Sequence, residues 1–599
     1  MSVRSRLRFA ELRWLVAGVV AVALLARLTL LGSRIAHWDE ARVGYWILRY
    51  METGVYAYRP IVHGPFLQQV TPAVFTLLGA SDFSMRLVPA LVGGLLPASA
   101  LLFRDRLSDR ETLALSLLLA ADPTLLYFSR FMRGDVLVGA FAFVAFGLFV
   151  RAVDRTPRYL VPAMAMVALA FTVKENALAY LAAWVAALGL LLDHRLLLAS
   201  ASDADGSVPD ALARALGRVR AGVRAGLPWL LVSLPVFLGI TVAFYAPRDP
   251  APGAVSLQNA GTNATAWSLV VEEATLGSAD RLVEGWVAGE GEHSYFVFLG
   301  GVLKDFALGS AGVAVLGLLG TAVDRYGGAP RSLVQHAFFW GLVSVAAYPA
   351  ITDIVAPWLV VHLVLPLSIP AAVGAVWLLD VGREALATDD RRRATVVGVV
   401  LLLVSVQLVG GAVATSYVAP TAPENELAQY AQPVGDFRPT LETMAASDDP
   451  ALLVYGSYFV TGREVGRLDY RPHCMRVGGW FNALPLPWYL ERDGVGTTCA
   501  ANASDLPDEL PPVVAVKVEN RTLDAVRVPD ALAARTEGYD RRLVLFRQRN
   551  TPVLFLVDDS RVDRKDDSRV DRKDDSRVDR KDDSRVDRKL LFSRAGSGR

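Results

Sequence analysis

The sequence predicts a mainly α-helical, polytopic membrane protein with a small exported α/β domain. Hydrophobic residues make up 53% of the 599-residue chain, and its mean hydropathy is +0.35. The apolar residues gather into long blocks, and a helix needs roughly 20 such residues to cross a bilayer. About eleven segments fit that pattern, near 14–32, 83–103, 111–129, 136–153, 159–173, 177–192, 227–245, 308–323, 333–350, 358–379 and 395–418.

Composition divides the chain into three parts. Residues 1–418 hold all the long apolar segments and form the predicted transmembrane domain. Residues 419–557 contain short apolar runs between turn signals, which are typical of strands in a small soluble domain. Residues 558–599 form a low-complexity tail in which Asp-Asp-Ser-Arg-Val-Asp-Arg-Lys occurs four times. Such a repeat offers too little apolar surface to fold alone, although a single solvated helix is an alternative.

The arginine distribution predicts how the chain crosses the cell membrane. Four arginines lie within residues 4–13, and alternate loops hold about twice as many as the opposite loops. Because arginine excess marks the cytoplasmic side, we expect a cytoplasmic amino terminus and an exported domain over 419–557. Both cysteines, Cys474 and Cys499, lie in that domain and favour one disulfide, two free thiols being the alternative. Sequons at positions 263, 502 and 520 also lie in predicted outside segments.

Other segments are predicted to lie at the membrane surface. Residues 66–78 are apolar but of borderline length, which favours an interfacial helix. An amphipathic piece is expected near 293–306, and an arginine-rich helix near 209–224 is expected on the anionic inner surface. The net charge of +1 and the lack of a basic stripe argue against a nucleic-acid partner. No His-Glu-x-x-His motif or Cys/His cluster occurs, so no cofactor is predicted, and a divalent metal stays possible.

The most informative motif is the acid pair Asp39-Glu40, which follows the first apolar segment at once. A carboxylate at the membrane surface can take a proton from an acceptor hydroxyl as a general base. The alternative is a helix-capping acid paired with Arg42, and an isolated acid pair is a weak signal.

Further polar residues lie at the outside ends of other segments. Arg130, Arg133 and Asp135 lie in one short loop, and arginine forks match phosphate oxygens, although arginine also anchors helices at the interface. Lys174-Glu175 lies in a very short gap between two segments, where the lysine could contact a phosphate or pair with its neighbour. His63 precedes a Gly-Pro turn and could be a phosphate ligand or only a surface histidine.

A last group of this kind contains Trp358 and His362. Trp358 could be an ordinary residue of the aromatic belt at the membrane surface.

Taken in order, these motifs resemble the GT-C membrane glycosyltransferases, the class of protein O-mannosyltransferases and lipid A aminoarabinose transferases. The order is the acid pair, the turn at 63–65, Gly-x-Ser-Asp-Phe-x-x-Arg-Leu-x-Pro-Ala over 79–90, Ser-Arg-x-x-Arg-x-Asp over 129–135, and Lys174-Glu175. The resemblance covers about residues 10–200 and is strongest to the archaeal flippase activity-associated membrane protein family. Residues 357–362 and 485–490 are also similar to that family.

The resemblance implies protein glycosylation from a polyprenyl- or dolichyl-phosphate sugar, with a glycan or protein acceptor outside the membrane. It makes Asp39 the base, with Glu40 in support. It also implies substrate-binding roles for His63, Arg130, Arg133, Asp135, Lys174, Glu175 and His362. Gly64 departs from the family's usual proline, which leaves the phosphate contact at this turn in doubt.

Two function classes therefore stand beside each other. The first is a membrane glycosyltransferase in which cations bind the donor phosphate and stabilise its departure. The second is a non-enzymatic protein that binds a lipid-linked sugar or assists its translocation. An ion-coupled transporter ranks last, because such proteins carry charges in mid-span, whereas these charges lie at segment ends.

Overall fold

The computed structural model describes most of the chain and divides it into two compact units. The described residues are 9–58, 64–174, 176–201, 208–262, 264–287, 294–328, 330–352, 354–428, 431–460, 474–475, 477–546 and 551–561. Unit 1 takes its described residues from Met1–Val434, Leu484–Arg492 and Phe546–Asn550, and unit 2 takes them from Gly435–Ala483, Asp493–Leu545 and Thr551–Arg599.

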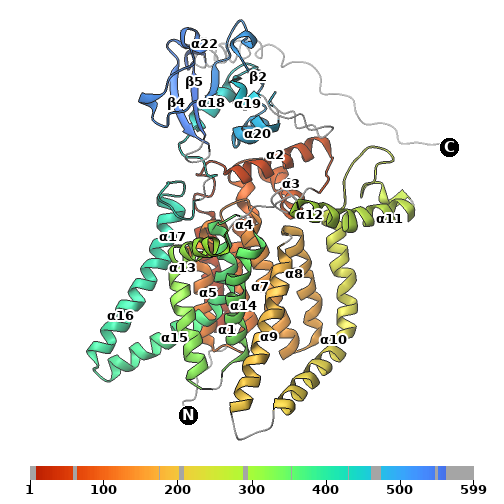
Figure 1. Cartoon of the computed structure of the whole chain (residues 1–599), viewed down its shortest axis with the longest axis vertical. Helices are drawn as coiled ribbons and strands as arrows, with labels where there is room; N and C mark the ends of the chain where they lie inside the picture. The colour runs from red at the N-terminus through yellow and green to blue at the C-terminus, as the bar shows by residue number, and fades with distance from the viewer. Residues whose placement is uncertain are drawn as a thin grey trace, which may run out of the picture. The chain divides into compact units, whose positions relative to one another are not determined.

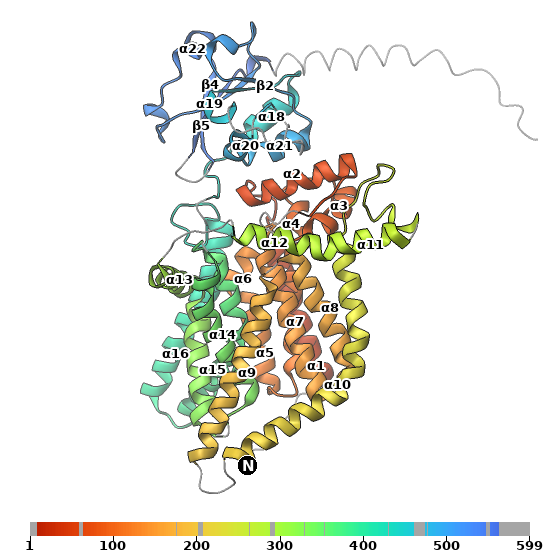
Figure 2. The same ribbon diagram turned by 45° about the vertical axis from the view of Figure 1, so that its right-hand side comes forward.

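Unit 1 is a helical bundle (Figure 1). Its α-helices are α1 (Phe9–Leu28), α2 (Trp38–Thr53), α3 (Phe66–Leu78), α4 (Ser84–Leu95), α5 (Asp109–Ala121), α6 (Pro123–Phe128), α7 (Gly134–Asp154), α8 (Leu160–Val173), α9 (Ala177–Ala201), α10 (Val208–Tyr245), α11 (Ala264–Glu272), α12 (Ser278–Val287), α13 (Tyr295–Tyr326), α14 (Ser332–Ile351), α15 (Val361–Ala387), α16 (Arg391–Ser405), α17 (Gly411–Val413) and α21 (Leu486–Asp493). Helices α2, α3, α11 and α12 lie across one end of the long helices in both views (Figures 1 and 2).

Eight helical segments in the described part are long and apolar enough to cross a membrane. They are Ser84–Phe103, Gly134–Asp154, Ala177–Leu197, Leu212–Tyr245, Tyr295–Tyr326, Ser332–Ile351, Pro357–Ala387 and Arg391–Val418. The predicted mainly helical, polytopic membrane fold is confirmed, and the count of about eleven crossings stays a prediction. The expected segment 14–32 lies largely in α1, which carries three charged residues. The expected segment 159–173 forms α8, which has only 14 residues.

The expected single helix over 111–129 is wrong, because the chain breaks between α5 and α6. Pro123 lacks the N–H that would continue the hydrogen-bond ladder of α5. Asp122 instead begins α6, its Oδ1 accepting a hydrogen bond from the Leu125 N–H at 3.0 Å. Pro at the first helical position after an Asp cap is a standard helix start.

The predicted surface segments have mixed outcomes. Helix α3 has the predicted bounds of the interfacial helix, Phe66–Leu78. The arginine-rich stretch near 209–224 is instead continuous with the following apolar segment in α10. The piece near 293–306 lies in the first part of α13, and the non-helical backbone angles of Ser310 mark a kink between this part and the expected membrane segment that follows it. The helix therefore runs through the first of these two predicted boundaries, whereas the chain kinks close to the second.

The core of unit 1 is centred on α15. In the segment Pro357–Ala387, 94% of the most apolar window is buried, against 11% for Leu212–Tyr245 and 17% for Arg391–Val418. Helix α13 crosses α15 through Gly320 and Gly374, and a Cβ added to Gly320 would lie 1.8 Å from the Pro370 carbonyl oxygen. Small residues allow such close helix packing in membranes. The exposed apolar faces of α10 and α16 are suited to lipid.

Unit 2 is a small α/β domain with a five-stranded sheet in the order β2-β1-β3-β5-β4. Strand β1 pairs in parallel with β2 and β3, whereas β5 pairs antiparallel with β3 and β4. Its elements are α18 (Arg438–Ala446), β1 (Leu452–Tyr455), α19 (Ser457–Val460), α20 (Val477–Ala483), β2 (Thr497–Ala500), β3 (Val513–Lys517), α22 (Asp530–Ala533), β4 (Asp540–Leu545) and β5 (Pro552–Val557). The predicted disulfide joins Cys474 to Cys499. The tail from 562 onward lies outside the described residues.

Candidate active site

Helix α2 begins with a capping box that places both acids of the pair in its first turn. The His37 Nδ1 accepts a hydrogen bond from the Asp39 N–H at 3.0 Å, and the Glu40 carboxylate accepts one from the His37 N–H at 2.8 Å. Burial lowers the pKa of His37 to about 3. The imidazole is therefore neutral at physiological pH, as an accepting Nδ1 requires.

The Glu40 carboxylate accepts hydrogen bonds from several parts of the chain. This fully buried group accepts two hydrogen bonds from Arg34, at 2.9 and 3.0 Å, and two from Arg86, at 2.8 and 2.9 Å. The Met132 N–H donates a further bond at 2.9 Å. Burial by itself would raise the pKa of Glu40, but the two guanidinium groups outweigh burial and lower it. Glu40 is thus an anchor that joins α2 to α4 and to the loop before α7.

Asp39 has a different environment, although it is the next residue. Its carboxylate pairs with the Arg133 guanidinium, and its side chain stays 12% exposed. Arg133 Nε also donates to Asp135 Oδ2 at 3.1 Å, and Lys174 Nζ donates to Asp135 Oδ1 at 2.8 Å. Asp39, Arg133, Asp135 and Lys174 therefore form a row of alternating charges, which we call the charged row.

The two ends of the charged row are its most accessible members. The side chain of Lys174 is 19% exposed, whereas those of Arg133 and Asp135 are 3% and 1% exposed. Burial alone would lower the pKa of Arg133, but Asp39 and Asp135 raise it above its ordinary value. Arg133 thus remains charged, and a ligand at the surface would meet a carboxylate at one end and an ammonium at the other.

Buried aromatic side chains pack against the charged row. The Arg133 guanidinium lies 3.9 Å from the ring centroid of Trp358, which is only 8% exposed. His362 is fully buried, its Nε2 lies 3.9 Å from Asp135 Oδ1, and its Nδ1 shares a 2.5 Å hydrogen bond with the Tyr180 hydroxyl. These contacts place His362 behind Asp135, where it supports the charged row without facing solvent.

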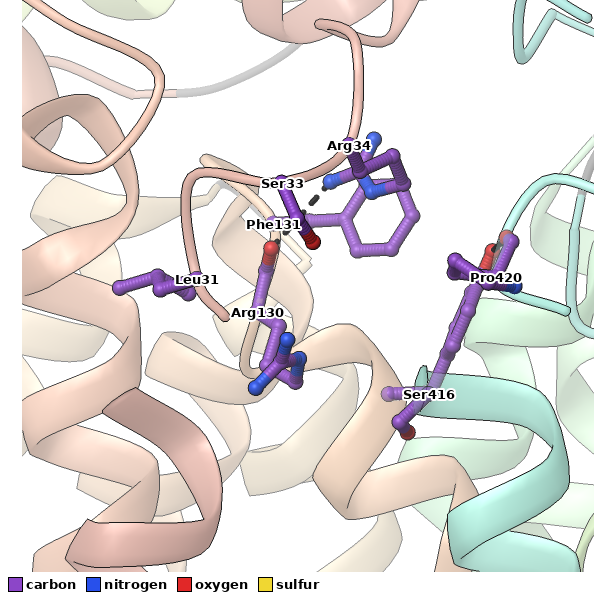
Figure 3. Close-up of a pocket in the computed structure, with 8 residues that line it drawn as sticks. Leu31, Ser33, Arg34, Arg130, Phe131, Ser416 and Pro420 are labelled. Atoms are coloured by element: carbon purple, nitrogen blue, oxygen red, sulfur yellow. Dashed lines mark hydrogen bonds between the residues drawn. The ribbon is translucent and has the colours of Figure 1, made fainter. Parts of the chain in front are cut away.

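Arg130 faces away from the charged row. Its guanidinium donates to four carbonyl oxygens at and just beyond the end of α1, those of residues 26, 27, 29 and 30, at 2.6 to 3.0 Å. It also lies 4.7 Å from the Tyr417 ring centroid. A small pocket lies beside it, where Arg34 donates to the Arg130 carbonyl oxygen at 3.2 Å (Figure 3). Arg130 thus satisfies helix-terminal carbonyls that would otherwise lack partners.

The turn at Gly64 explains its departure from the proline that the resemblance led us to expect. The Gly64 N–H donates to the Val173 carbonyl oxygen at 2.8 Å, and proline has no such donor. A Cβ at this position would also lie 2.4 Å from the Thr172 carbonyl oxygen. Glycine therefore lets the turn pack against the end of α8, next to Lys174. His63 and Glu175 lie outside the described residues.

Sequence reasoning missed the partners of Glu40. Arg34 and Arg86 lie 6 and 46 residues from it, whereas the expected partner Arg42 lies over the Trp38 ring, 5.5 Å from its centroid. Arg86 occurs in the 79–90 motif, so an arginine at the start of an apolar segment was the available signal. Among the described residues, no group of three or more His, Cys, Asp and Glu side chains is arranged to hold a metal ion.

Comparison with known proteins gives two partial family matches. Residues 62–202 match the model of the dolichyl-phosphate-mannose-protein mannosyltransferases. Residues 437–558 match the C-terminal domain of the Agl23 flippase-associated protein. The predicted resemblance is confirmed in both of its parts, and so is the predicted class, a membrane glycosyltransferase. The first match includes Arg133, Asp135 and Lys174, whereas Asp39 precedes it.

No curated protein matches the chain. The crystal structures of ArnT from Cupriavidus metallidurans, in the apo state and bound to undecaprenyl phosphate, are similar to it with 15% identity and a TM-score of 0.47. The apo structure is matched over 91% of this chain and 98% of that chain, and the bound structure over 90% and 97%.

Proposed function

We propose that the charged row binds the phosphate of a polyprenyl- or dolichyl-phosphate sugar and that Asp39 activates the acceptor. The observation that carries this proposal is the convergence of Asp39, Arg133, Asp135 and Lys174 at one end of the bundle, from three separate helical regions. Arg133 and Lys174 supply donors for phosphate oxygens. The partly exposed Asp39 supplies a carboxylate within reach of the same cations.

The transfer step follows from these positions. An acceptor hydroxyl attacks the anomeric carbon, so that a new carbon–oxygen bond forms while the bond to the phosphate oxygen breaks. Asp39 takes the proton of the hydroxyl, and the polyprenyl phosphate leaves with the bonding electrons. Cations that are held in place before reaction stabilise the charge on the leaving phosphate.

The other predicted site residues take graded roles in this proposal. Asp135 orients Arg133 and Lys174, and His362 supports Asp135 from the buried side. Glu40 and Arg130 hold the surrounding backbone, as their buried partners indicate. His63 and Glu175 stay predicted substrate contacts, because they adjoin the described residues Gly64 and Lys174.

We further propose that the charged row faces the outside of the cell and that the acceptor is an extracellular glycan or protein. Helix α7 supports this orientation. It spans 21 residues, or about 32 Å at 1.5 Å per residue, close to the thickness of the hydrocarbon core. Arg133 lies at its start, and an ion-pair cluster containing Arg151 and Arg155 lies at its end. For unit 2 by itself we also propose an extracellular location, because its disulfide fits an oxidising environment.

The test is transfer by the purified full-length protein in proteoliposomes. A panel of dolichyl- and undecaprenyl-phosphate sugars is offered with hydroxyl acceptors, and products are detected by mass spectrometry. We expect transfer that is lost in Asp39→Asn and kept in the surface control Asp280→Asn. Wild-type transfer by Asp39→Asn would remove Asp39 from the mechanism. Absence of transfer with every donor would contradict the enzymatic proposal.

A second candidate function is binding or translocation of the lipid-linked sugar without transfer. The match of residues 437–558 to a flippase-associated domain favours it, and the same cations could hold the phosphate. Dithionite quenching of a fluorescent polyprenyl-phosphate sugar in the same vesicles discriminates between the two. Movement between leaflets without any glycosylated product would support the second candidate over the first.

A further inference from the structure

The segment that leads into Asp39 is held by residues from the far half of the chain. The Gln432 Oε1 accepts a hydrogen bond from Arg34 Nη1 at 2.7 Å, and its Nε2 donates to the Ile35 carbonyl oxygen at 3.2 Å. The Ala36 N–H donates to the Tyr489 hydroxyl at 2.8 Å. Groups on three consecutive residues, 34 to 36, are therefore paired with positions 432 and 489. Gln432 is fully buried.

Helix α21, which brings Tyr489, packs along α2. A Cβ added to Gly44 would lie 2.8 Å from the Trp488 ring, so the two helices touch directly at this glycine. One turn further along α2, Arg49 pairs with Glu491 at 3.3 Å. Trp488 and Tyr489 are both buried. The contact with α2 thus begins before Asp39 and continues toward the other end of the helix.

The Tyr489 hydroxyl is the centre of a three-group bridge. It accepts from the Ala36 N–H and donates to Asp82 Oδ2 at 3.0 Å, while Trp488 Nε1 donates to Asp82 Oδ1 at 3.2 Å. Asp82 lies just before α4, the helix that carries Arg86 and so the anchor of Glu40. One hydroxyl therefore ties the approach to Asp39 to the helix that fixes the neighbouring acid.

We propose that Tyr489 and Gln432 are positioning residues for transfer, and we call Gln432 and α21 together the C-terminal clamp. The proposal rests on the proposed function, because its kinetic consequence requires Asp39 to be the base. By fixing residues 34–36, the clamp sets where the first turn of α2 begins and so where the Asp39 carboxylate meets Arg133. A misplacement of about 1 Å can lower a rate on the order of 10²-fold.

Tyr489→Phe tests the clamp with the smallest change. It removes one oxygen atom and leaves the Ala36 N–H and Asp82 without this partner. Tyr295→Phe is the matched control, because the Tyr295 hydroxyl donates to the Ala346 carbonyl oxygen at an exposed position. Gln432→Met is a second variant of similar size, which removes both bonds to residues 34 and 35.

Two measurements are made on the full-length protein in detergent and in proteoliposomes. Hydrogen exchange followed by mass spectrometry reports on peptides that cover residues 33–40, and steady-state kinetics separate kcat from the donor KM. For Tyr489→Phe we expect at least tenfold faster exchange in those peptides, unchanged exchange in α7 and α15, and a five- to twentyfold lower kcat at a donor KM within about twofold of wild type. Gln432→Met should behave in the same way.

The outcomes separate positioning from simple stability. Unchanged kcat in both variants would overturn the proposal, and so would a loss of activity that matches only the loss of folded protein, with exchange rising throughout the bundle. A wild-type protein without any transfer would contradict the proposed function. The exchange comparison would then still decide whether the clamp holds residues 33–40, since it needs no substrate.

Discussion

Asp39 and Glu40 are neighbours in the sequence, but the structure gives them opposite environments. Glu40 is fully buried and accepts hydrogen bonds from two arginine side chains and two backbone N–H groups. Asp39 keeps an exposed edge and shares Arg133 with Asp135. A carboxylate whose hydrogen-bonding capacity is filled by the protein can only hold structure. One that is partly exposed, in the same row as the partly exposed Lys174, can exchange its partners for a substrate.

The comparison also separates two kinds of cation. Arg34 and Arg86 are buried on either side of Glu40, and both guanidinium groups share its one carboxylate as their counter-ion. Lys174 is partly exposed and has a flexible stem, which allows it to turn from Asp135 toward a ligand. The larger structural contribution is therefore expected from the Glu40 anchor and the larger catalytic contribution from the charged row. Four predictions test this division.

Asp39→Asn should have the largest effect, and it should act on turnover. Loss of a general base lowers rates by about 10²–10⁴-fold, whereas the amide keeps the shape of the side chain and Arg133 keeps Asp135. We expect the thermal midpoint in detergent to stay close to that of the wild type. Transfer assays with Asp280→Asn as the exposed control measure the contrast. Near-normal turnover would place the base elsewhere.

Glu40→Gln should act mainly on folding. Removing this charge leaves Arg34 and Arg86 buried without their counter-ion, and breaking a buried pair in this way costs about 3–5 kcal/mol. The same change at Glu52, an exposed residue on the same helix paired with Arg49, should cost less than about 1 kcal/mol. Thermal unfolding and yield of both variants measure the difference. Equal stability of the two would show that the anchor contributes little.

Lys174→Met should weaken donor binding. Hydrogen bonds to charged groups contribute about 1.5–3 kcal/mol, so we expect the donor KM to rise about 10- to 100-fold at a moderately lower kcat. Lys304→Met is the matched control, because Lys304 is an exposed lysine paired with Glu426 on the same unit. A donor KM that is the same in both variants would exclude Lys174 from the phosphate site.

His37 should make stability depend on pH. Its folded-state pKa is about 3, below its ordinary value of 6.5, so the unfolded chain binds the proton first as the pH falls. The contribution of neutral His37 to the free energy of unfolding is complete above about pH 6.5. Below that pH it decreases by up to about 1.4 kcal/mol per pH unit. His37→Asn keeps an acceptor at the helix start. In this variant the thermal midpoint should change less with pH between pH 6.5 and 4.5 than it does in the wild type. An unchanged slope would contradict this origin.

Local sequence patterns were sufficient to predict elements that depend mainly on neighbouring residues. Apolar length predicted most of the long helices, and the bounds of α3 followed from an apolar run between a Gly-Pro turn and a glycine. The short runs near 452, 513 and 543 became strands β1, β3 and β4. The break at Asp122 was missed, although an Asp-Pro pair is itself a local signal. Apolar length alone does not locate this break, because it takes no account of the N–H that Pro123 lacks.

The sequence by itself determined a helical membrane protein, a separate small α/β domain, and an acid pair that follows the first apolar segment. Only the tertiary structure decided which acid of that pair is the anchor and which remains open. The reason is that their partners come from residues 46, 92 and 94 positions away, and the clamp comes from about 400 or more. Ion pairing depends on which side chains packing brings together, and no local pattern of charge or hydropathy specifies that.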